Sequence, residues 1–582
     1  MTGQRLSWYT YLKLINHPNR EFEREGSMKT KRERVIVFLP VIVSIALVVG
    51  ILLGNWITGI RIRSIVTDEV ARQKFSIRPG NNSGSGFSLT PRGNKISSAL
   101  QYILNEYVDT VSLDNLNETV MPALVDKLDP HSIYIPATDF QRYSEPLVGN
   151  FSGIGVSFNM TDDTVAIINT IPNGPSEVVG IAAGDRIIMV DDSLVAGVNM
   201  PSDNIVKMLK GPKNTQVKVS VYRRGEKAPL DFEITRDDIP IYSVDVAYVV
   251  DDNIGYIKIS QFAQTTFREF MQAIETLKSK GVDKLIIDLR NNGGGIMEAA
   301  TMIADQFLEE GQLIVYTEGK ARPRENDYAT SRGILKKDKV VVLIDESSAS
   351  ASEILAGAIQ DNDRGLVIGR RSFGKGLVQE EMRFADGSAL RLTVARYYTP
   401  TGRSIQRSYE NGKEDYYHDL ADRIRRGEME HRDSIKFDDT QKFVTPGGKT
   451  VYGGGGIMPD VFVPVDTSTI SDYYNRARSL GLMYRFAFYY TDKNRASLEQ
   501  FTTAEEIEAY LNDQRILPEF IEFAKGKGVP PDYEDIRTSE LPLKQTIKAY
   551  VGRNVIDNIG FYPIIAKIDY TLQVAIDTMS KL

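Results

Sequence analysis

The feature that most limits how this chain can fold is the alternation of apolar and amphipathic segments between residues 240 and 466. Three short apolar runs have the length and composition of buried strands, at residues 254–259, 284–289 and 340–344. Segments with helical periodicity follow the first and the third run, at residues 266–278 and 351–361. Parallel strands need a long crossover connection, usually a helix, so this order predicts an α/β core with parallel units.

Composition narrows the chemistry that such a core could carry. The 582 residues include no cysteine, and the histidines are His17, His131, His418 and His431. The lack of cysteine excludes disulfides, cysteine-ligated zinc and a thiol nucleophile. The formal net charge of −7 argues against a general nucleic-acid binder. Because histidines are so few, a hydrolase made from this inventory needs another base.

Near the start of the chain, residues 35–54 carry no charge. At 1.5 Å per residue a run of this length spans about 30 Å, the thickness of a bilayer core. Four basic residues precede the run: Lys29, Lys31, Arg32 and Arg34. They predict a cytoplasmic segment at 1–34 and an anchor at 35–60, although two arginines beyond the run weaken this orientation. The alternative is a cleaved signal peptide, but the run is long and lacks a small-x-small cleavage site. Both Met1 and Met28 are candidates for the start.

The other boundaries follow composition and periodicity: a linker at 61–95, a helical part at 96–148, a β-rich unit at 149–236, the α/β core at 237–466 and a helical C-terminal domain at 467–582. In the last domain, Thr503 and Glu506 have the spacing of a capping box. The aromatic residues between positions 473 and 490 are expected to pack between helices. No motif there indicates a function, so contact between copies of the chain and docking of an adaptor both stay open.

The β-rich unit contains a glycine-bearing turn with the sequence SGIGV, residues 152–156, and the segment GPSEVVGIAAGDRI that begins at Gly174. This combination resembles a PDZ domain. In such a turn, successive N–H groups hold a terminal carboxylate while the peptide adds a strand to the sheet edge. The resemblance implies that a substrate C-terminus binds at Gly153, Ile154, Gly155 and Val156. The alternative is a small β domain with glycine turns.

A cluster of serines follows the third apolar run, in the segment DESSASASE at residues 345–353. A strand that ends in a tight turn and enters a helix exposes a hydroxyl near unsatisfied N–H groups, which favour a developing oxyanion. The candidate nucleophiles on this ground are Ser347, Ser348, Ser350 and Ser352. The alternative is a plain capping box from Ser350 to Glu353.

Lys375 lies between two glycines in the segment RSFGKGLVQ, residues 371–379. An apolar environment lowers the pKa of a lysine because burial disfavours its charged form. A lysine that serves as a general base has to be substantially neutral near pH 7. Lowering its pKa from about 10.4 to about 7–8 costs roughly 3–5 kcal/mol, which the fold must supply. The alternative is a surface lysine in a hairpin turn.

The second apolar run continues as DLRNNGGG, residues 288–295, so a glycine loop leads from a strand toward a helix. Bare main-chain N–H groups at a helix start make an anion site, although loops of this kind also bind phosphate. A separate run of glycines at 453–456 has no following Lys-Ser or Lys-Thr pair, so we expect no phosphate loop there.

Taken in order, eight segments resemble the carboxyl-terminal processing peptidases, the tail-specific serine proteases of family S41. These segments are SGIGV, GDRIIMVDD, GYIKISQF, LRNNGGG, SSASASEI, FGKGLVQ, YYTPTGRSIQ and GGIMPD, and the resemblance covers residues 96–466. It implies a multidomain α/β fold: a crotonase-like ββα-spiral core with an inserted PDZ domain, an N-terminal transmembrane helix and a helical C-terminal extension. The family uses a Ser/Lys dyad, and Ser350 and Lys375 have its spacing of 25 positions.

The resemblance also implies roles for other residues. Gln379 positions the lysine, and Asp361 falls where some members of the family carry a supporting aspartate. The oxyanion donors are implied to be main-chain N–H groups, of Ala351 and Gly294, with Gly295 as the alternate. Gly293 stands where the family often has proline, which leaves the choice of glycine open. His131 is given a structural role, and no metal or cofactor is implied.

These inferences predict a membrane-anchored serine endopeptidase that cleaves envelope proteins near or from their C-terminal tails. Its anchor would lie in a bacterial inner membrane and its catalytic part in the periplasm, with proteins that carry accessible C-terminal tails as partners and no nucleic acid. One alternative is a catalytically inactive, membrane-tethered PDZ adaptor, against which the presence of Ser350, Lys375 and Gln379 argues. Another is a crotonase-type acyl-CoA enzyme, against which the PDZ unit and the anchor argue. Whether the PDZ unit activates or inhibits stays open.

Overall fold

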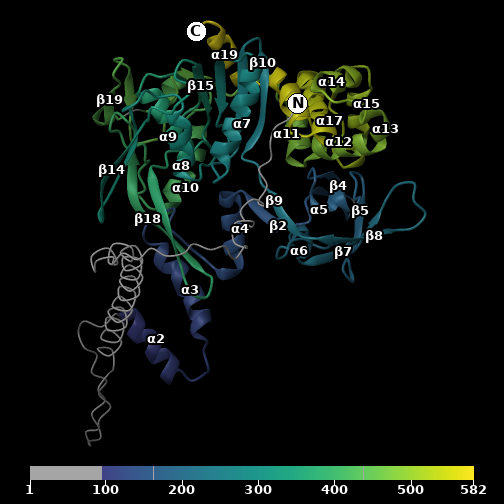
Figure 1. The fold of residues 1–582 in the computed structure, drawn as a ribbon, viewed down its shortest axis with the longest axis horizontal. Helices are drawn as coiled ribbons and strands as arrows, with labels where there is room; N and C mark the ends of the chain where they lie inside the picture. Colours follow the sequence, from purple (N-terminus) through teal and green to yellow (C-terminus); the bar gives the residue numbers. More distant parts are fainter. Residues whose placement is uncertain (1–94, 162, 437) are drawn as a thin grey trace, which may run out of the picture. The chain divides into compact units, whose positions relative to one another are not determined.

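The computed structural model describes residues 95–161, 163–436 and 438–582 (Figure 1). The predicted anchor at residues 35–60 lies outside the described residues. Within these ranges, no helix combines the length and the apolar character that crossing a bilayer requires. All elements after residue 99 belong to one compact unit.

Three helices occupy the segment predicted to be helical: α2 Lys95–Glu106, α3 Leu113–Val125 and α4 Ala137–Val148. Ser112 caps the start of α3, since its side chain accepts a hydrogen bond from the N–H of Asn115, and α4 ends at Gly149 in the left-handed conformation. A strand, β1 Ile133–Ile135, lies between α3 and α4. It pairs antiparallel with β18 (Ala389–Tyr398), which ties this segment to the α/β core.

The β-rich unit is a sheet in which the strands follow the order β3-β4-β5-β7-β8, with β6 beside β5. Its elements are β3 Val156–Thr161, β4 Thr164–Thr170, α5 Pro175–Val178, β5 Arg186–Val190, β6 Ser193–Leu194, α6 Ser202–Leu209, β7 Gln216–Tyr222 and β8 Leu230–Thr235. The strands β2 Asn150–Gly153 and β9 Asp237–Pro240 pair with each other and close the unit at its base. Because β3 stands at the end of this order, one edge of the sheet is open among the described residues.

The α/β core is built on a sheet of the order β10-β11-β12-β15-β16-β21. Its strands are β10 Val244–Asp251, β11 Ile254–Ile259, β12 Lys284–Asp288, β15 Lys339–Ile344, β16 Leu366–Gly369 and β21 Val461–Phe462. All neighbours from β11 onward pair in parallel, as the alternation of segments predicts. Three helices pack against one face of the sheet: α7 Thr266–Ser279, α8 Met297–Asp305 and α9 Ala351–Asp361 (Figure 1).

Both faces of this sheet are buried, which explains why its strands are apolar without alternation. Side chains alternate between the faces, so Leu285 and Ile287 join the core under the helices while Ile286 joins a second core on the opposite face. A second sheet has the order β1-β18-β13-β14, with β17 also paired to β18. Its other strands are β13 Leu313–Gly319, β14 Arg322–Tyr328 and β17 Leu377–Arg383. Between β18 and β21 lie α10 Lys413–Arg425, β19 Lys442–Val444 and β20 Thr450–Tyr452.

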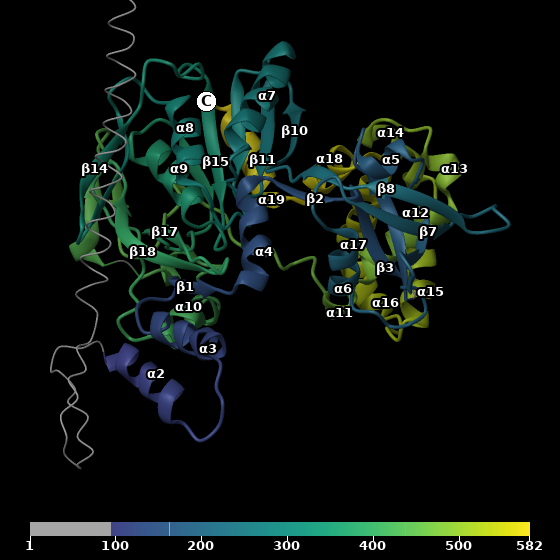
Figure 2. The same cartoon turned by 60° about the horizontal axis from the view of Figure 1, so that its bottom comes forward.

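The C-terminal region is helical, as predicted. Its elements are α11 Asp472–Ser479, α12 Leu482–Lys493, α13 Arg495–Leu498, α14 Ala504–Asn512, α15 Ile516–Gly526, α16 Tyr533–Thr538, α17 Glu540–Ile556, α18 Asn558–Ile565, the 3₁₀ turn Ala566–Ile568 and α19 Tyr570–Ser580. The helices from α11 to α18 enclose a core of their own, and Thr503 forms the expected capping box at α14. The last helix, α19, instead contacts β12, β15 and β16 of the core sheet (Figure 2).

Candidate active site

A cavity of about 690 Å³ brings Ser350 and Lys375 together. The glycine loop, the start of α9, the strand β17 and the end of α4 line it. Apolar side chains, among them Leu147, Ile296 and Leu377, form part of its wall, while Arg391 adds a positive charge. The cavity thus combines a hydroxyl, an amine and bare main chain with room for an apolar side chain.

Ser350 occupies the junction at which β15 gives way to α9. Its backbone has φ 55° and ψ −114°, a conformation that non-glycine residues seldom adopt. Such strain persists where the surroundings enforce it, and it turns the side chain of the residue out of the path of the chain. Ser350 and Glu353 also form the capping box that the sequence allowed, so the capping role and exposure to the cavity occur together.

The neighbouring serines are engaged elsewhere. Ser348 is buried, and its hydroxyl donates to the carbonyl of Leu289 (2.8 Å). The hydroxyl of Ser352, also buried, donates to the carbonyl of Asn292 (2.9 Å). Ser347 is exposed and does not line the cavity. Of the four candidates, Ser350 is therefore the one that the structure places beside Lys375.

Lys375 is held beside the cavity by a relay of polar groups. Its Nζ donates to Oε1 of Gln379 (3.0 Å), and Nε2 of Gln379 donates to the carbonyl of His131 (2.6 Å). Burial, together with the positive charge of Arg391, lowers the pKa of Lys375 below its ordinary value. Within the described part of the chain, no hydrogen bond joins Nζ of Lys375 to the side chain of Ser350, although both residues line the same cavity.

His131 contributes through its main chain, a role that no side-chain pattern could indicate. Asp129 fixes the loop, since its Oδ1 accepts from the N–H of His131 and of Ser132 (both 2.8 Å). The imidazole lies against Tyr416, with Nε2 2.7 Å from its hydroxyl. Burial and the nearby charge of Lys375 lower the pKa of His131 to about 4, so the ring is neutral near pH 7.

Glu353 joins the serine side of the cavity to the lysine side. Its carboxylate is fully buried and accepts from the N–H of Ser350 (2.8 Å) and from the N–H of Lys375 (2.9 Å). It also accepts from the hydroxyl of Ser372 (2.5 Å) and the N–H of Gly374 (2.7 Å). Burial raises the pKa of Glu353 although these donors oppose the shift. Ser350 and Lys375 are thus tied to one carboxylate through their main chains.

The glycine loop lies directly against Ser350. A Cβ atom added to Gly294 would come within 2.7 Å of Cβ of Ser350, so a larger residue would displace the serine. The N–H of Gly294 donates to Oδ1 of Asn292 (2.8 Å) and is therefore engaged. In the described residues, the N–H groups of Ala351 and Gly295 donate to no protein acceptor. The N–H groups of Ala351, Gly293 and Gly295 are therefore available to a ligand, whereas that of Gly294 is engaged.

Asp361 does not reach the site. It lies at the far end of α9, about 16 Å from Ser350 at 1.5 Å per residue. There it forms a fully buried ion pair with Arg403, with Oδ1 and Nη2 2.6 Å apart. Its carboxylate also accepts from the hydroxyl of Thr401 (2.6 Å). Asp361 therefore contacts neither Ser350 nor Lys375, so any support that the resemblance implies for it is not a contact within the cavity.

The turn at residues 153–156 has the features of an anion site at a sheet edge. Among the described residues, the N–H groups of Ile154 and Gly155 donate to no protein acceptor. The carbonyl of Ile154 is held by the hydroxyl of Ser176 (2.6 Å), and the side chain of Ile154 is buried in the core of the unit. The turn leads into β3, the edge strand. A peptide that added a strand there would bring its terminal carboxylate to these N–H groups.

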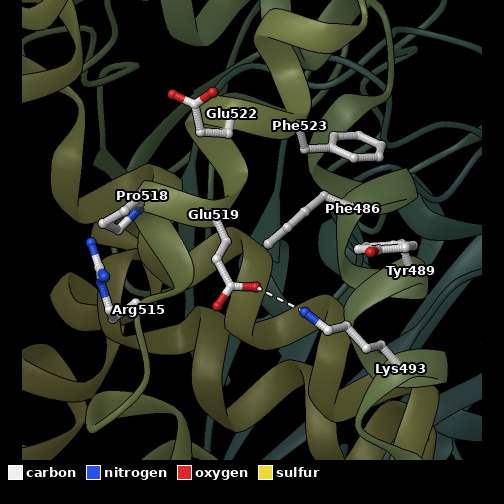
Figure 3. A pocket seen from close by; sticks show the side chains of 8 residues that line it. All are labelled: Phe486, Tyr489, Lys493, Arg515, Pro518, Glu519, Glu522 and Phe523. Atoms are coloured by element: carbon white, nitrogen blue, oxygen red, sulfur yellow. Dashed lines mark ion pairs between the residues drawn. The ribbon is translucent and has the colours of Figure 1, made fainter.

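A second cavity, of about 430 Å³, lies between α12 and α15 of the C-terminal region (Figure 3). Figure 3 shows Phe486, Tyr489 and Phe523 on one side of it, with Lys493 facing Glu519 across a distance of 3.8 Å. The aromatic residues predicted to pack between helices do so at Tyr473 and Phe486, whereas Tyr489 is half exposed. This cavity holds neither member of the Ser350–Lys375 pair.

Comparison with known proteins identifies families that match the α/β core and the β-rich unit. Residues 253–414 match peptidase family S41, and residues 152–234 match the PDZ domain. Residues 473–557 match a family of unknown function, DUF8443. The two functional matches enclose the serine junction, the lysine loop, the glycine loop and the carboxylate turn described above.

Relatives that match more than half of the chain agree with these matches. The chain is 35% identical over 317 residues to the carboxy-terminal-processing protease of Bartonella bacilliformis, covering 54% of this chain and 72% of the relative. It is 33% identical over 348 residues to the carboxy-terminal processing protease CtpA of Bacillus subtilis, covering 59% and 74%. A solved photosystem II D1 C-terminal processing protease is 25% identical, covers 63% of this chain and 86% of its own, and has a TM-score of 0.34. The chain belongs to the carboxy-terminal processing peptidases of family S41, and it is a serine-type peptidase with a PDZ domain.

Proposed function

We propose that Ser350 and Lys375 are the catalytic dyad of a membrane-anchored endopeptidase that cleaves envelope proteins near or from their C-terminal tails. The observation that carries the proposal is the shared cavity: a strained serine at a helix start, a partly buried lysine and free main-chain N–H groups of the glycine loop lie at one space. The capping box and the hairpin turn, the two plain alternatives, leave this convergence unexplained.

The reaction follows from the placement of these groups. Neutral Lys375 takes the proton of Ser350, whose Oγ then forms a bond to the scissile carbonyl carbon. The flexible stem of the lysine lets Nζ exchange Gln379 for Ser350. The N–H groups of Ala351 and Gly295 hold the oxyanion, each worth about 3–4 kcal/mol in comparable sites. The C–N bond breaks as Lys375 returns the proton to the leaving amine, and water, deprotonated by Lys375, releases the acyl group from Ser350.

Recognition of the tail is assigned to the PDZ unit. Its open edge at β3 and the free N–H groups of Ile154 and Gly155 support binding of an extended peptide with a free carboxylate. The names of the relatives, which refer to carboxy-terminal processing, support the same substrate class.

The location is proposed on the sequence pattern. The uncharged run within residues 35–60, preceded by basic residues, supports a bacterial inner-membrane anchor that leaves the catalytic part in the periplasm. Bacterial relatives support the same cell type. Association of copies through the C-terminal region stays a proposal of lower rank, because no contact in the described residues carries it.

The test uses the full chain in detergent and a folded substrate protein with an apolar C-terminal tail. Cleavage is followed with the tail ending in a free carboxylate and with the same tail ending in an amide. We expect the amide to be cleaved far more slowly, and Ser350→Ala and Lys375→Ala to abolish cleavage while the melting temperature stays the same. Equal cleavage of acid and amide would refute tail recognition, and an active Ser350→Ala variant would refute the dyad.

A further inference from the structure

The end of the C-terminal region takes part in the protease core. Residues 558–582 lie beyond the segments matched by family S41 and by the family of unknown function. Yet Leu572, Ala575 and Met579 of α19 pack with Ile286, Val341 and Leu343 on the face of the core sheet opposite α7, α8 and α9. The helix that covers this face also places one charged residue, Asp569, at its start.

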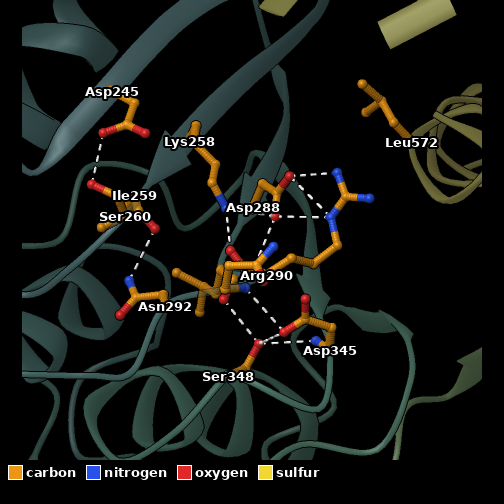
Figure 4. A network of polar contacts seen from close by, with 12 residues as sticks. Asp245, Lys258, Ile259, Ser260, Asp288, Arg290, Asn292, Asp345, Ser348 and Leu572 are labelled. Atoms are coloured by element: carbon orange, nitrogen blue, oxygen red, sulfur yellow. Dashed lines mark hydrogen bonds and ion pairs between the residues drawn. The ribbon is translucent and has the colours of Figure 1, made fainter. Parts of the chain in front are cut away.

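Asp569 forms a bidentate ion pair with an arginine of the glycine loop. Its two oxygens accept from Nη1 and Nη2 of Arg290, at 2.8 and 2.6 Å. Arg290 also donates to Asp288 at the end of β12 (Nη2 to Oδ2, 2.6 Å), and Lys258 lies 3.3 Å from the other oxygen of Asp288. Figure 4 shows Asp288 between Lys258 and Arg290, with Leu572 of α19 on the far side of the arginine. The cluster contains two cations and two anions, so its net charge is zero.

The same arginine begins the loop that reaches the active site. Lys258 donates to the carbonyl of Arg290, and the N–H of Asn291 donates to Asp345 (3.0 Å). The next residue, Asn292, holds the N–H of Gly294 with its side chain, and its carbonyl receives the N–H of Ala349 (3.0 Å). Fixing Arg290 therefore fixes the start of the glycine loop, which packs against Ser350.

We propose that Asp569 is a positioning residue for the oxyanion donors, so that the C-terminal segment sets the rate of the peptidase through Arg290. The inference rests on the proposed function, because it assigns the glycine loop to the oxyanion. Apolar packing already attaches α19 to the sheet. A largely buried ion pair is weak evidence for net stability, although removing one partner leaves the other charge less well compensated. What the pair does add is a fixed orientation of the Arg290 side chain, since a bidentate carboxylate fixes the plane of a guanidinium.

The decisive variant is Asp569→Asn. Asn caps helices about as well as Asp, so the cap that Asp569 provides to the N–H of Leu572 (3.0 Å) is retained while the charge is lost. One matched control is Asp577→Asn, the same change at an exposed position of α19. A second control is Leu572→Ala, which weakens the packing of α19 but leaves the ion pair intact.

The measurements separate positioning from stability. In Asp569→Asn we expect kcat to fall about tenfold while KM stays within about twofold. A peptide aldehyde, which forms an oxyanion on reaction with Ser350, should bind about tenfold more weakly, while the matching product peptide binds equally well. The double variant Arg290→Gln/Asp569→Asn should lose no more than Arg290→Gln alone, because the two residues act as a unit.

Three results would overturn the inference: kcat and aldehyde affinity equal to those of Asp577→Asn, the same loss of kcat in Leu572→Ala, or additive losses in the double variant. If Asp569→Asn does not fold, Asp569→Glu, whose carboxylate sits one methylene further out, takes its place. It should show a smaller loss of kcat with KM unchanged, and an unchanged kcat overturns the inference. Ser350→Ala in the same assay isolates the proposed function: if Ser350→Ala is active, the dyad fails, whatever the result at Asp569.

Discussion

The serine side and the lysine side of the cavity are held in different ways. On the serine side, buried groups hold main chain: Asn292 fixes the glycine loop, and Ser348 and Ser352 tie the serine turn to it. On the lysine side, one side chain, Gln379, holds the reacting nitrogen itself and depends on a single carbonyl, that of His131. The serine side is a rigid frame, whereas the lysine side is a relay whose last member can move.

This difference suits the two roles. Oxyanion donors act by being fixed before the reaction, so a frame of main-chain hydrogen bonds serves them. A general base has to give and take protons at more than one atom, so its nitrogen needs a partner that it can leave. Two side chains contact the main chain of both sides. The carboxylate of Glu353 accepts from the N–H groups of Ser350 and Lys375, and the hydroxyl of Tyr397 lies within hydrogen-bond distance of the carbonyls of Ser350 (3.1 Å) and Lys375 (2.7 Å).

The largest effect is expected from a variant that removes the amine of Lys375. Lys375→Met keeps the length and apolar stem of the side chain but has no base. We expect kcat/KM to fall at least about 10⁴-fold, because the members of a nucleophile–base pair act as a unit. The melting temperature should stay within a few degrees, since Met suits a partly buried site. Steady-state assays and thermal unfolding measure the two, and a variant with a tenth of wild-type activity would show that another base serves Ser350.

The next largest effect is expected from a change at Glu353, which contacts both the serine side and the lysine side of the cavity. Glu353→Gln replaces a buried acceptor of four donors by a group with one carbonyl oxygen and an NH₂ that faces N–H groups. We expect the free energy of unfolding to fall by about 3 kcal/mol and kcat to fall by more than tenfold. Urea unfolding and turnover give the values. The exposed helix residue Glu505 provides the control, since Glu505→Gln should change neither.

A smaller effect tests the relay alone. Gln379→Leu keeps the volume but removes both hydrogen bonds of the amide, so Nζ of Lys375 and the carbonyl of His131 lose their shared partner. We expect kcat to fall by about 10- to 100-fold, with stability reduced by about 1 kcal/mol. Turnover and urea unfolding check this, and Gln500→Leu at an exposed position is the control. If stability falls as much as in Glu353→Gln, the lysine side is a frame too, and the contrast between the sides is lost.

The smallest effect is a displacement of the pH profile. Burial and the charge of Arg391 lower the pKa of Lys375, while the charges of Glu353 and Asp129 oppose the shift. Activity should rise with pH as Lys375 loses its proton, through a pKa below the ordinary lysine value. Arg391→Gln removes a positive charge, so the pKa of Lys375 rises and the profile of kcat/KM moves to higher pH. The exposed cavity residue Arg383 provides the control, because Arg383→Gln should leave the profile in place.

The sequence predicts the parts of this molecule that depend on local pattern. The strands β11, β12 and β15 are apolar runs in an alternation with helical segments, and they lie where the pattern places them. The junction of Ser350 with a helix and the glycine context of Lys375 are also local, and the structure brings both residues to one cavity.

Features set by distant main chain escape this reasoning. β1 has three residues, too few for a pattern. Its partner β18 follows more than half of the α/β core in the sequence. The support that His131 gives to Gln379 comes from a carbonyl, which every residue possesses. The N–H of Gly294 is engaged, unlike those of its neighbours Gly293 and Gly295, because of one side-chain contact of Asn292. The placement of Asp361 beside Arg403 likewise depends on a partner distant in sequence.

Because α19 lies at the end of the chain, its face of the core sheet is covered only late in translation. Ser350 and Lys375 leave the ribosome about 190 residues before Asp569. At roughly 5–20 residues per second, the nascent chain spends about 10–40 s with both reacting groups made and one face of its central sheet uncovered. During that interval Asp569 has not been synthesised, so the Arg290 side chain lacks this ion-pair partner. On the proposed roles of Ser350 and Asp569, completion of the last helix separates a nascent chain that already carries the nucleophile from a finished peptidase.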